Sequence, residues 1–312
     1  MISLRYHIIS IAAVFLALAL GVVLGSTAIS DRLLSGLSSN REQLSHQVGE
    51  LQNERNALRA RLTDADAFDA SVGPRIVNGA LRGRTVVLVT TADANPADRD
   101  ALRGLLGNAG ATVTGELQLT DAFTDPARSD QLSELSTRLL PAGLRLPTAS
   151  DAGTLSGGLL GSLLLVNSNN GRAQATAAET TAVLAGLSDG GFVRAGPQVL
   201  PAQLAVILTG GPTVGNGSGD RAGVLARFAT QLDHAGAGAV LAGRPGSADG
   251  NGPIGVVRAD TAAASVLSTV DDVSTAAGRV VTVLALAEQA QGHAGRYGTG
   301  GNAQAVVPAI QS

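Results

Sequence analysis

An apolar stretch of 22 residues, Ile8 to Ile29, runs directly into a leucine heptad, and this junction constrains the chain more than any other feature. About 20 apolar residues in a helix are enough to span the roughly 30 Å hydrocarbon core of a bilayer. No charged residue interrupts the stretch. We therefore predict a transmembrane anchor over residues 1–29.

A cleaved signal sequence is the alternative interpretation of these residues. Ser26, Thr27 and Ala28 are small residues of the kind found at cleavage sites, although the apolar stretch is longer than a usual signal sequence contains. Arg5 precedes the stretch and favours an N-terminus in the cytoplasm. Both interpretations place the bulk of the chain in an extracytoplasmic, periplasmic compartment, and the anchor predicts a single-pass membrane protein.

Residues 30–70 carry the heptad pattern of a coiled coil. Leucine recurs at intervals of seven at the d positions, and three of the five a positions are apolar. Arg41 and Arg55 occupy the other two a positions, where polar residues fix register at a cost in stability. The alternative is a single amphipathic helix that packs against the globular part. The coiled coil predicts a homodimer with a seam formed by Leu34, Leu37, Leu44, Val48, Leu51, Leu58 and Leu62.

Composition excludes several classes of function. The net charge is −3 and no basic stripe is present, so we expect no nucleic-acid partner. All 22 basic residues are arginine, and a chain without lysine has neither a Walker-type phosphate loop nor a Schiff-base site. The absence of cysteine excludes disulfides.

Metal and cofactor binding are not predicted from the residues. Soft Cu(I) sites need thiolate or thioether ligands, and the chain has no cysteine and one methionine, Met1. The four histidines, at positions 7, 46, 234 and 293, show no paired spacing. We therefore expect neither a resident metal nor a cofactor.

Residues 80–298 alternate short apolar runs with helical stretches. Strands of four to eight residues separated by helices predict an α/β domain with a mostly parallel sheet. Residues 299–312 are rich in glycine and alanine and are predicted to be a flexible tail. The expected strands are 84–91, 111–119, 163–166, 205–208, 239–242 and 280–285; the expected helices are 96–108, 129–140, 175–187 and 221–234.

Two motifs resemble functional loops but have simpler explanations. The sequence from Gly186 to Gly190 contains Ser188 and matches a nucleophile elbow, yet it follows a predicted helix and is better explained as a helix end. The glycine-rich sequence from Thr209 to Gly219 follows an apolar run but lacks the lysine of a phosphate loop, so we interpret it as a flexible loop. We predict that the protein is not an enzyme.

Several segments resemble the mycobacterial copper transporter B family of actinobacterial envelope proteins. The resemblance implies a role in copper efflux or homeostasis at the cell envelope, with copper as a partner and an outer-membrane location. The continuous apolar runs do not predict the alternating strands of an outer-membrane barrel. The matching strings are residues 1–5, the end of the apolar stretch at 20–26, and residues 72–77, 241–247, 268–272, 278–285 and 295–300.

The resemblance also implies an alternative function, since related corynebacterial proteins act with a membrane partner in cell division and envelope assembly. In that case the chain is a dimeric scaffold that binds an envelope or division protein. Candidate partner-binding residues lie in the matching strings at predicted strand ends or loops, where α/β sheets gather binding groups. They are Arg244, Asp271, Asp272, Arg279 and Tyr297. Turns and helix caps are the alternative explanation of the same residues.

Overall fold

The computed structural model describes residues 4–309, with side chains for 5–25, 41 and 43–309. It divides the chain into two compact units, residues 1–65 and 66–312. The first unit is helical from Leu4 onward. The second is an α/β fold with a mostly parallel sheet, as the sequence predicts.

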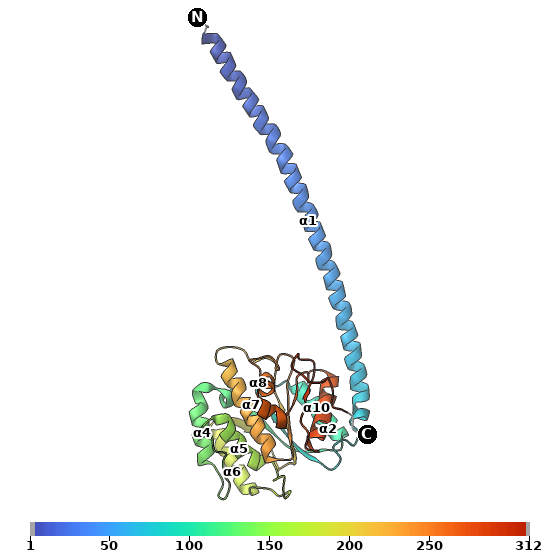
Figure 1. The fold of residues 1–312 in the computed structure, drawn as a ribbon, viewed down its shortest axis with the longest axis vertical. Helices are drawn as coiled ribbons and strands as arrows, with labels where there is room; N and C mark the ends of the chain where they lie inside the picture. Colours follow the sequence, from blue (N-terminus) through green and yellow to red (C-terminus); the bar gives the residue numbers. More distant parts are fainter. Residues whose placement is uncertain (1–3, 310–312) are drawn as a thin grey trace. The chain divides into compact units, whose positions relative to one another are not determined.

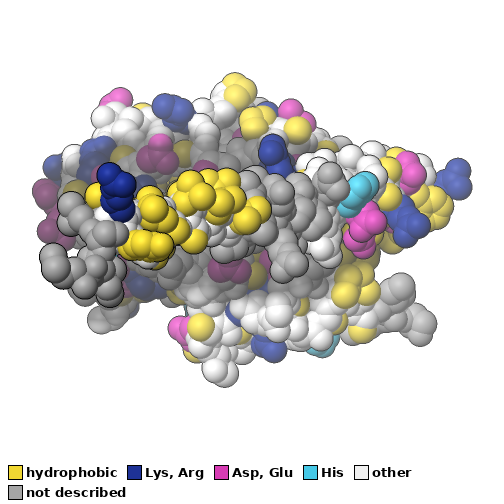
Figure 2. Space-filling model, turned by 90° about the horizontal axis from the view of Figure 1, so that it is seen from above, with side chains coloured by type: hydrophobic (Ala, Val, Ile, Leu, Met, Phe, Trp, Pro, Cys, Tyr) yellow, Lys and Arg dark blue, Asp and Glu magenta, His cyan; other side chains and the backbone are white. Residues whose placement is uncertain are grey.

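The helix α1, Leu4–Ile76, covers the predicted anchor from Leu4 onward and the predicted coiled coil without a break (Figure 1). Its segment Arg5–Gly25 is long and apolar enough to cross a membrane, and none of it is buried within the chain. Figure 2, viewed from the N-terminal end, shows hydrophobic side chains uncovered along this helix. The pairing of two such helices lies beyond a single chain and stays a prediction.

Seven strands form one sheet within residues 4–309, in the order β3-β2-β1-β4-β5-β6-β7. Neighbouring strands are parallel except β2 and β3, which run antiparallel. Chain order reverses between β1 and β4, so the crevice at their carboxyl ends is the switch point where α/β sheets commonly bind ligands. The strands are β1 Thr85–Thr90, β2 Thr112–Leu119, β3 Val193–Ala195, β4 Leu204–Leu208, β5 Ala239–Ala242, β6 Ser268–Val270 and β7 Arg296–Tyr297.

Side chains of the central strands point alternately to the two faces of the sheet, and each face has its own hydrophobic core. In β1, Val87 and Val89 face one core, whereas Val86 and Leu88 face the other. Successive side chains of a strand point to opposite faces, so strands buried on both faces consist of continuous apolar residues. This is why the predicted strands contain continuous runs of valine, leucine and alanine.

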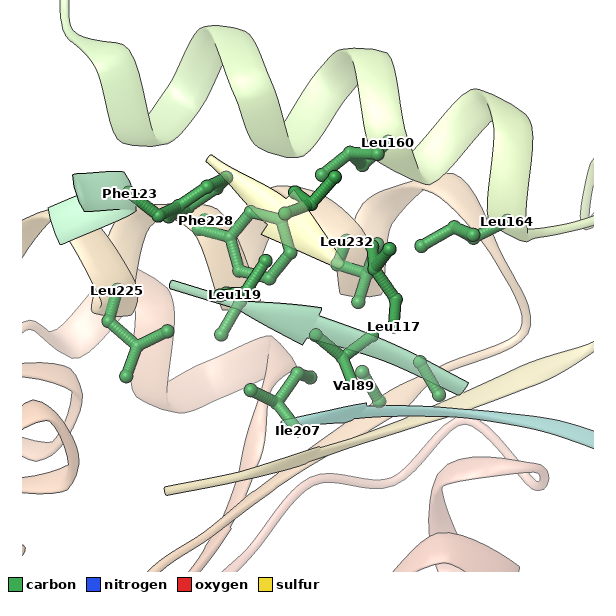
Figure 3. Close-up of a cluster of buried hydrophobic side chains, with 14 of the residues drawn as sticks. Val89, Leu117, Leu119, Phe123, Leu160, Leu164, Ile207, Leu225, Phe228 and Leu232 are labelled. Atoms are coloured by element: carbon green, nitrogen blue, oxygen red, sulfur yellow. The ribbon is translucent and has the colours of Figure 1, made fainter. Parts of the chain in front are cut away.

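Helices cover both faces (Figure 1). The first core lies beneath α3 to α9, and Figure 3 shows Phe123, Phe228 and Leu160 directed toward β1, β2 and β4. The second core lies beneath α2, α10 and the residues that follow α1. The helices are α2 Pro96–Asn108, α3 Asp121–Thr124, the 3₁₀ helix η1 Pro126–Arg128, α4 Ser129–Arg138, α5 Ala152–Leu164, α6 Ala177–Asp189, α7 Ser218–Ala235, α8 Pro253–Ala259, α9 Thr261–Val266 and α10 Ala276–Gln289.

The strand predicted at 163–166 is wrong, because residues 163 and 164 end α5 and the next two residues form only isolated bridges. Gly153, Gly157 and Gly161 lie one turn apart and face α7. A Cβ at Gly157 would lie 2.8 Å from the carbonyl oxygen of Phe228, and one at Gly161 would lie 2.6 Å from Ala235. These glycines therefore allow two buried helices to approach closely. Beyond α5, Leu165 bridges Ala202 and Val166 bridges Ala173, and both bridges lie outside the seven strands.

The strand predicted at 280–285 is also wrong, because these residues lie in the middle of α10. An apolar run of this length is buried equally well in a helix or a strand, so periodicity does not separate the two. The capping residues favour the helix. The Thr275 side chain accepts a hydrogen bond from the N–H of Gly278, and the Asp66 carboxylate accepts one from the N–H of Ala276 at 2.5 Å. Both bonds satisfy amides that a helix leaves open in its first turn.

Asp233, near the end of α7, has a pKa displaced by its surroundings. Its carboxylate accepts a hydrogen bond from the N–H of Ala239 at 2.6 Å. Burial raises the pKa of Asp233 to about 7, and the bond from Ala239 opposes the rise. Since the unfolded pKa is about 3.9, the neutral carboxyl stabilises the fold at acidic pH, and this contribution is lost as the pH rises through the folded pKa.

We expect Asp233→Asn to remove this pH dependence while keeping an oxygen that accepts the Ala239 bond. Between about pH 5 and pH 8 the wild type should lose roughly 2–3 kcal/mol of stability relative to the variant. Urea denaturation at both pH values measures the difference. If the two proteins show the same pH dependence, Asp233 does not titrate in this range in the folded state.

Candidate functional site

The five predicted partner-binding residues gather at the carboxyl edge of the sheet and the helix beside it. Arg244 follows β5, Asp271 and Asp272 follow β6, and Tyr297 ends β7. Arg279 lies in the first turns of α10. Parallel strands end at the same edge, so residues distant in the sequence come together there.

Asp98 joins two of these residues and was not singled out from the sequence. It lies in the first turn of α2 and is buried. Its carboxylate accepts a hydrogen bond from Arg244 Nε at 2.6 Å and lies 3.6 Å from Arg279 Nη1. Hydrogen bonding to Asp98 raises the pKa of Arg244, with burial opposing the rise. Arg279 also donates to the carbonyl oxygens of Val273 and Ser274, so it holds the turn before α10.

Arg258, on α8, forms a buried ion pair with Asp271. The Nη1 to Oδ2 distance is 2.5 Å, and the two side chains are only 1% and 3% exposed. Arg258 also donates from Nε to Thr269 Oγ1, from Nη2 to the carbonyl oxygen of Tyr297 and from Nη1 to Asn302 Oδ1, so each guanidinium nitrogen makes a hydrogen bond. A buried guanidinium needs such complete pairing, because each unpaired charge carries a large desolvation cost.

Asp271 also holds the segment that follows β7. Its Oδ1 accepts hydrogen bonds from the N–H groups of Thr299 and Gly300, at 2.8 Å and 3.2 Å. The side-chain amide of Asn302 donates to the carbonyl oxygen of Ala248. These bonds tie the first residues of 299–312, the predicted flexible tail, to the sheet edge. Residues 310–312 lie outside the described part, and mobility of the tail stays a prediction.

Asp272 and Tyr297 complete the edge. Burial and the neighbouring charge of Asp271 raise the pKa of Asp272, whose Oδ1 is buried without a hydrogen-bond partner among the described residues. The hydroxyl of Tyr297 donates to Glu288, and burial together with Glu288 raises its pKa. Asp271, Asp272 and Tyr297 are thus almost fully buried, whereas the Arg244 side chain is 38% exposed. Partner binding by the five residues stays a prediction, and Arg244 is the most accessible of them.

The described residues bring no three histidine or carboxylate side chains together in an arrangement that would hold a metal ion. His234 lies in the last turn of α7, and His46 is exposed on α1. Ser188, from the string resembling a nucleophile elbow, lies in the last turn of α6, where Gly190 caps the helix.

Comparison with known proteins covers nearly the whole chain. The family model described as "Copper transport outer membrane protein, MctB" matches residues 1–308. The chain is 42% identical to the copper transporter MctB of Mycobacterium tuberculosis over 98% of this chain and 99% of that protein. The chain belongs to the MctB family. The MctB proteins of Mycobacterium bovis and Mycobacterium leprae are 42% and 40% identical to this chain, again over 98% of this chain and 99% of each relative.

Membership of the MctB family confirms the predicted resemblance. The match extends from the apolar helix through β7, so it includes that helix, the heptad region and the sheet edge. The scaffold alternative, in which the chain acts in cell division, receives no support from the MctB relatives, whose names describe copper transport.

Proposed function

We propose that this chain is a membrane-anchored cell-envelope protein that acts in copper homeostasis. The observation that carries the proposal is identity of 40–42% to copper transporters over 98% of this chain. Similarity of this extent covers every element of the fold, so the whole architecture is shared with the MctB relatives. The apolar helix Arg5–Gly25 supports an anchor, and we propose that the α/β unit lies in the periplasm.

The metal-binding side chains that the sequence offers favour a role in which copper is transported, and they do not favour a copper ion bound permanently to this chain. Cu(I) prefers thiolate and thioether ligands, and the chain contains no cysteine and one methionine. Among the described residues no group of three ligands gathers. We also propose that the protein is not an enzyme, in keeping with the position of Ser188 inside a helix.

We further propose that α1 pairs with a second copy through the predicted seam. The side chains of Leu44, Leu51 and Leu62 are 62–70% exposed in the single chain, and Val48 and Leu58 are also exposed. A heptad row of exposed leucines is costly in water and is the surface that a coiled coil buries. Leu34 and Leu37 belong to the same predicted seam but fall where side chains are not described.

Cellular copper content tests the proposed function. A Mycobacterium tuberculosis strain that lacks its MctB is expected to contain less copper when it expresses this chain than when it carries an empty vector, during growth at elevated copper. Elemental mass spectrometry measures the copper, and a strain expressing residues 66–312 alone is the control for the anchor. Equal copper content with this chain and with the empty vector would contradict the proposal.

A further inference from the structure

A pocket of about 240 Å³ opens at the switch point of the sheet, away from the Arg258–Asp271 ion pair. It lies where the loops after β1, β2 and β4 meet the first turns of α7. This is the crevice in which open α/β sheets bind small molecules. The glycine-rich loop after β4, interpreted from the sequence as flexible, forms one wall through Pro212, Thr213 and Val214.

Three charged side chains line this pocket, and none of them forms an ion pair among the described residues. They are Arg221 of α7, Asp121 at the start of α3, and Asp93 after β1. The Nε of Arg221 is buried, and no residue in the described part of the chain hydrogen-bonds to it. A buried guanidinium nitrogen without an acceptor costs free energy unless a ligand supplies one.

The Asp93 carboxylate lies against Gly210, just after β4, where only a residue without a side chain leaves room for it. A Cβ at this position would overlap the Asp93 carboxylate, with its carboxyl carbon only 2.7 Å away. The other oxygen of Asp93 accepts a hydrogen bond from Thr91, whose hydroxyl also contacts the carbonyl oxygen of Leu208. The Asp93 carboxylate is therefore fixed at the pocket wall.

The size and charges of the pocket select the class of ligand. Ligand pockets for drug-sized molecules measure roughly 300–1,000 Å³, so this one suits a smaller molecule. The turn after β1 has no glycine, and two carboxylates line the pocket, which disfavours a nucleotide phosphate. An unpaired guanidinium and two unpaired carboxylates instead match a ligand that carries both a carboxylate and an ammonium group.

We propose that this pocket binds a free amino acid, with the ligand carboxylate at Arg221 and its ammonium group at Asp93 and Asp121. Five threonines line the pocket together with these charges, and an apolar wall receives the ligand side chain. The threonines are Thr91, Thr120, Thr124, Thr209 and Thr213, and the apolar wall consists of Leu119, Pro212, Val214, Ala222 and Leu225. This inference does not depend on the role in copper homeostasis.

Isothermal titration calorimetry on the full chain in detergent tests the proposal. The probes are the free L-amino acids one at a time, together with butylamine and butyrate, each of which carries only one of the two charges. We expect at least one amino acid to bind with one site per chain and at least tenfold tighter than either single-charge probe. Arg221→Gln should weaken that binding at least tenfold, and Asp93→Asn should weaken it as well.

Arg227→Gln is the matched control, because Arg227 lies on the same helix but pairs with Asp151 outside this pocket. It should bind the amino acid as the wild type does. Arg221→Gln is expected to fold, since Arg221 forms no ion pair that the substitution would break, and thermal unfolding checks this. Three results would overturn the proposal: no amino acid binds at millimolar concentration, butylamine binds as tightly as the amino acids, or Arg221→Gln binds like the wild type.

Discussion

Asp271→Ala is expected to destabilise the α/β unit by about 3–5 kcal/mol, because it leaves the buried Arg258 guanidinium without its counter-charge. The Arg258 side chain is 1% exposed, so water cannot replace the lost carboxylate. The substitution also removes the acceptor that holds the amides of Thr299 and Gly300. Urea denaturation of the full chain measures the loss.

Two further variants separate the lost charge from the lost hydrogen bonds. Asp271→Asn keeps an acceptor oxygen and should be less destabilised than Asp271→Ala. Adding Arg258→Met to Asp271→Ala removes the unpaired charge and should recover part of the stability. Glu134→Ala breaks the exposed pair with Arg138 and should cost less than about 1 kcal/mol. A cost for Asp271→Ala no larger than that of Glu134→Ala would contradict a structural role for the buried pair.

The double substitution Leu44→Asp and Leu51→Asp is expected to convert a dimer into monomers. Burying a leucine contributes about 1.5–3 kcal/mol, and four leucines change across the two chains of the seam. The loss of at least roughly 6 kcal/mol corresponds to more than about a 10,000-fold weaker association. Analytical ultracentrifugation in detergent measures the mass, against 31.1 kDa for one chain.

His46→Asp together with Asn53→Asp is the matched control for the seam. Both residues lie seven apart at outward-facing f positions of the same heptads, and both are exposed. This control should stay dimeric, because it adds the same number of acidic groups outside the seam. A monomeric wild type, or a double leucine variant that remains a dimer, would contradict the proposed pairing.

Local patterns predicted the central elements of the fold well. The helix α2 begins at Pro96, where the Asn95 side chain caps it, and both signals are visible in the sequence. The strands β1, β4 and β5 are continuous apolar runs close to their predicted bounds. The failures were apolar runs inside α5 and α10, which are buried helices with little polar face, so the pattern of apolar residues did not separate helix from strand. The strands β6 and β7 have three and two residues, too few to show a period.

The sheet edge was predicted in part. Arg244 and Asp271 were singled out because they lie in the family-like strings 241–247 and 268–272, at predicted strand ends or loops. Their partners carried no such signal: Asp98 lies 146 residues from Arg244, and Arg258 is a single charge on a short helix. A pairing between residues so far apart in the chain depends on strand order, which local sequence patterns do not determine.

The central claim is that an uncleaved helix anchors the chain and holds the α/β unit outside the cytoplasm. The chain has no cysteine, so single substitutions provide unique sites for a membrane-impermeant maleimide. Ser150→Cys lies at an exposed position of the α/β unit, and Ser3→Cys precedes the apolar helix. We predict that spheroplasts label Ser150→Cys directly and Ser3→Cys only after lysis. Protection of Ser150→Cys until lysis would contradict the account, and absence of residue 3 from the mature protein would identify the helix as a cleaved signal.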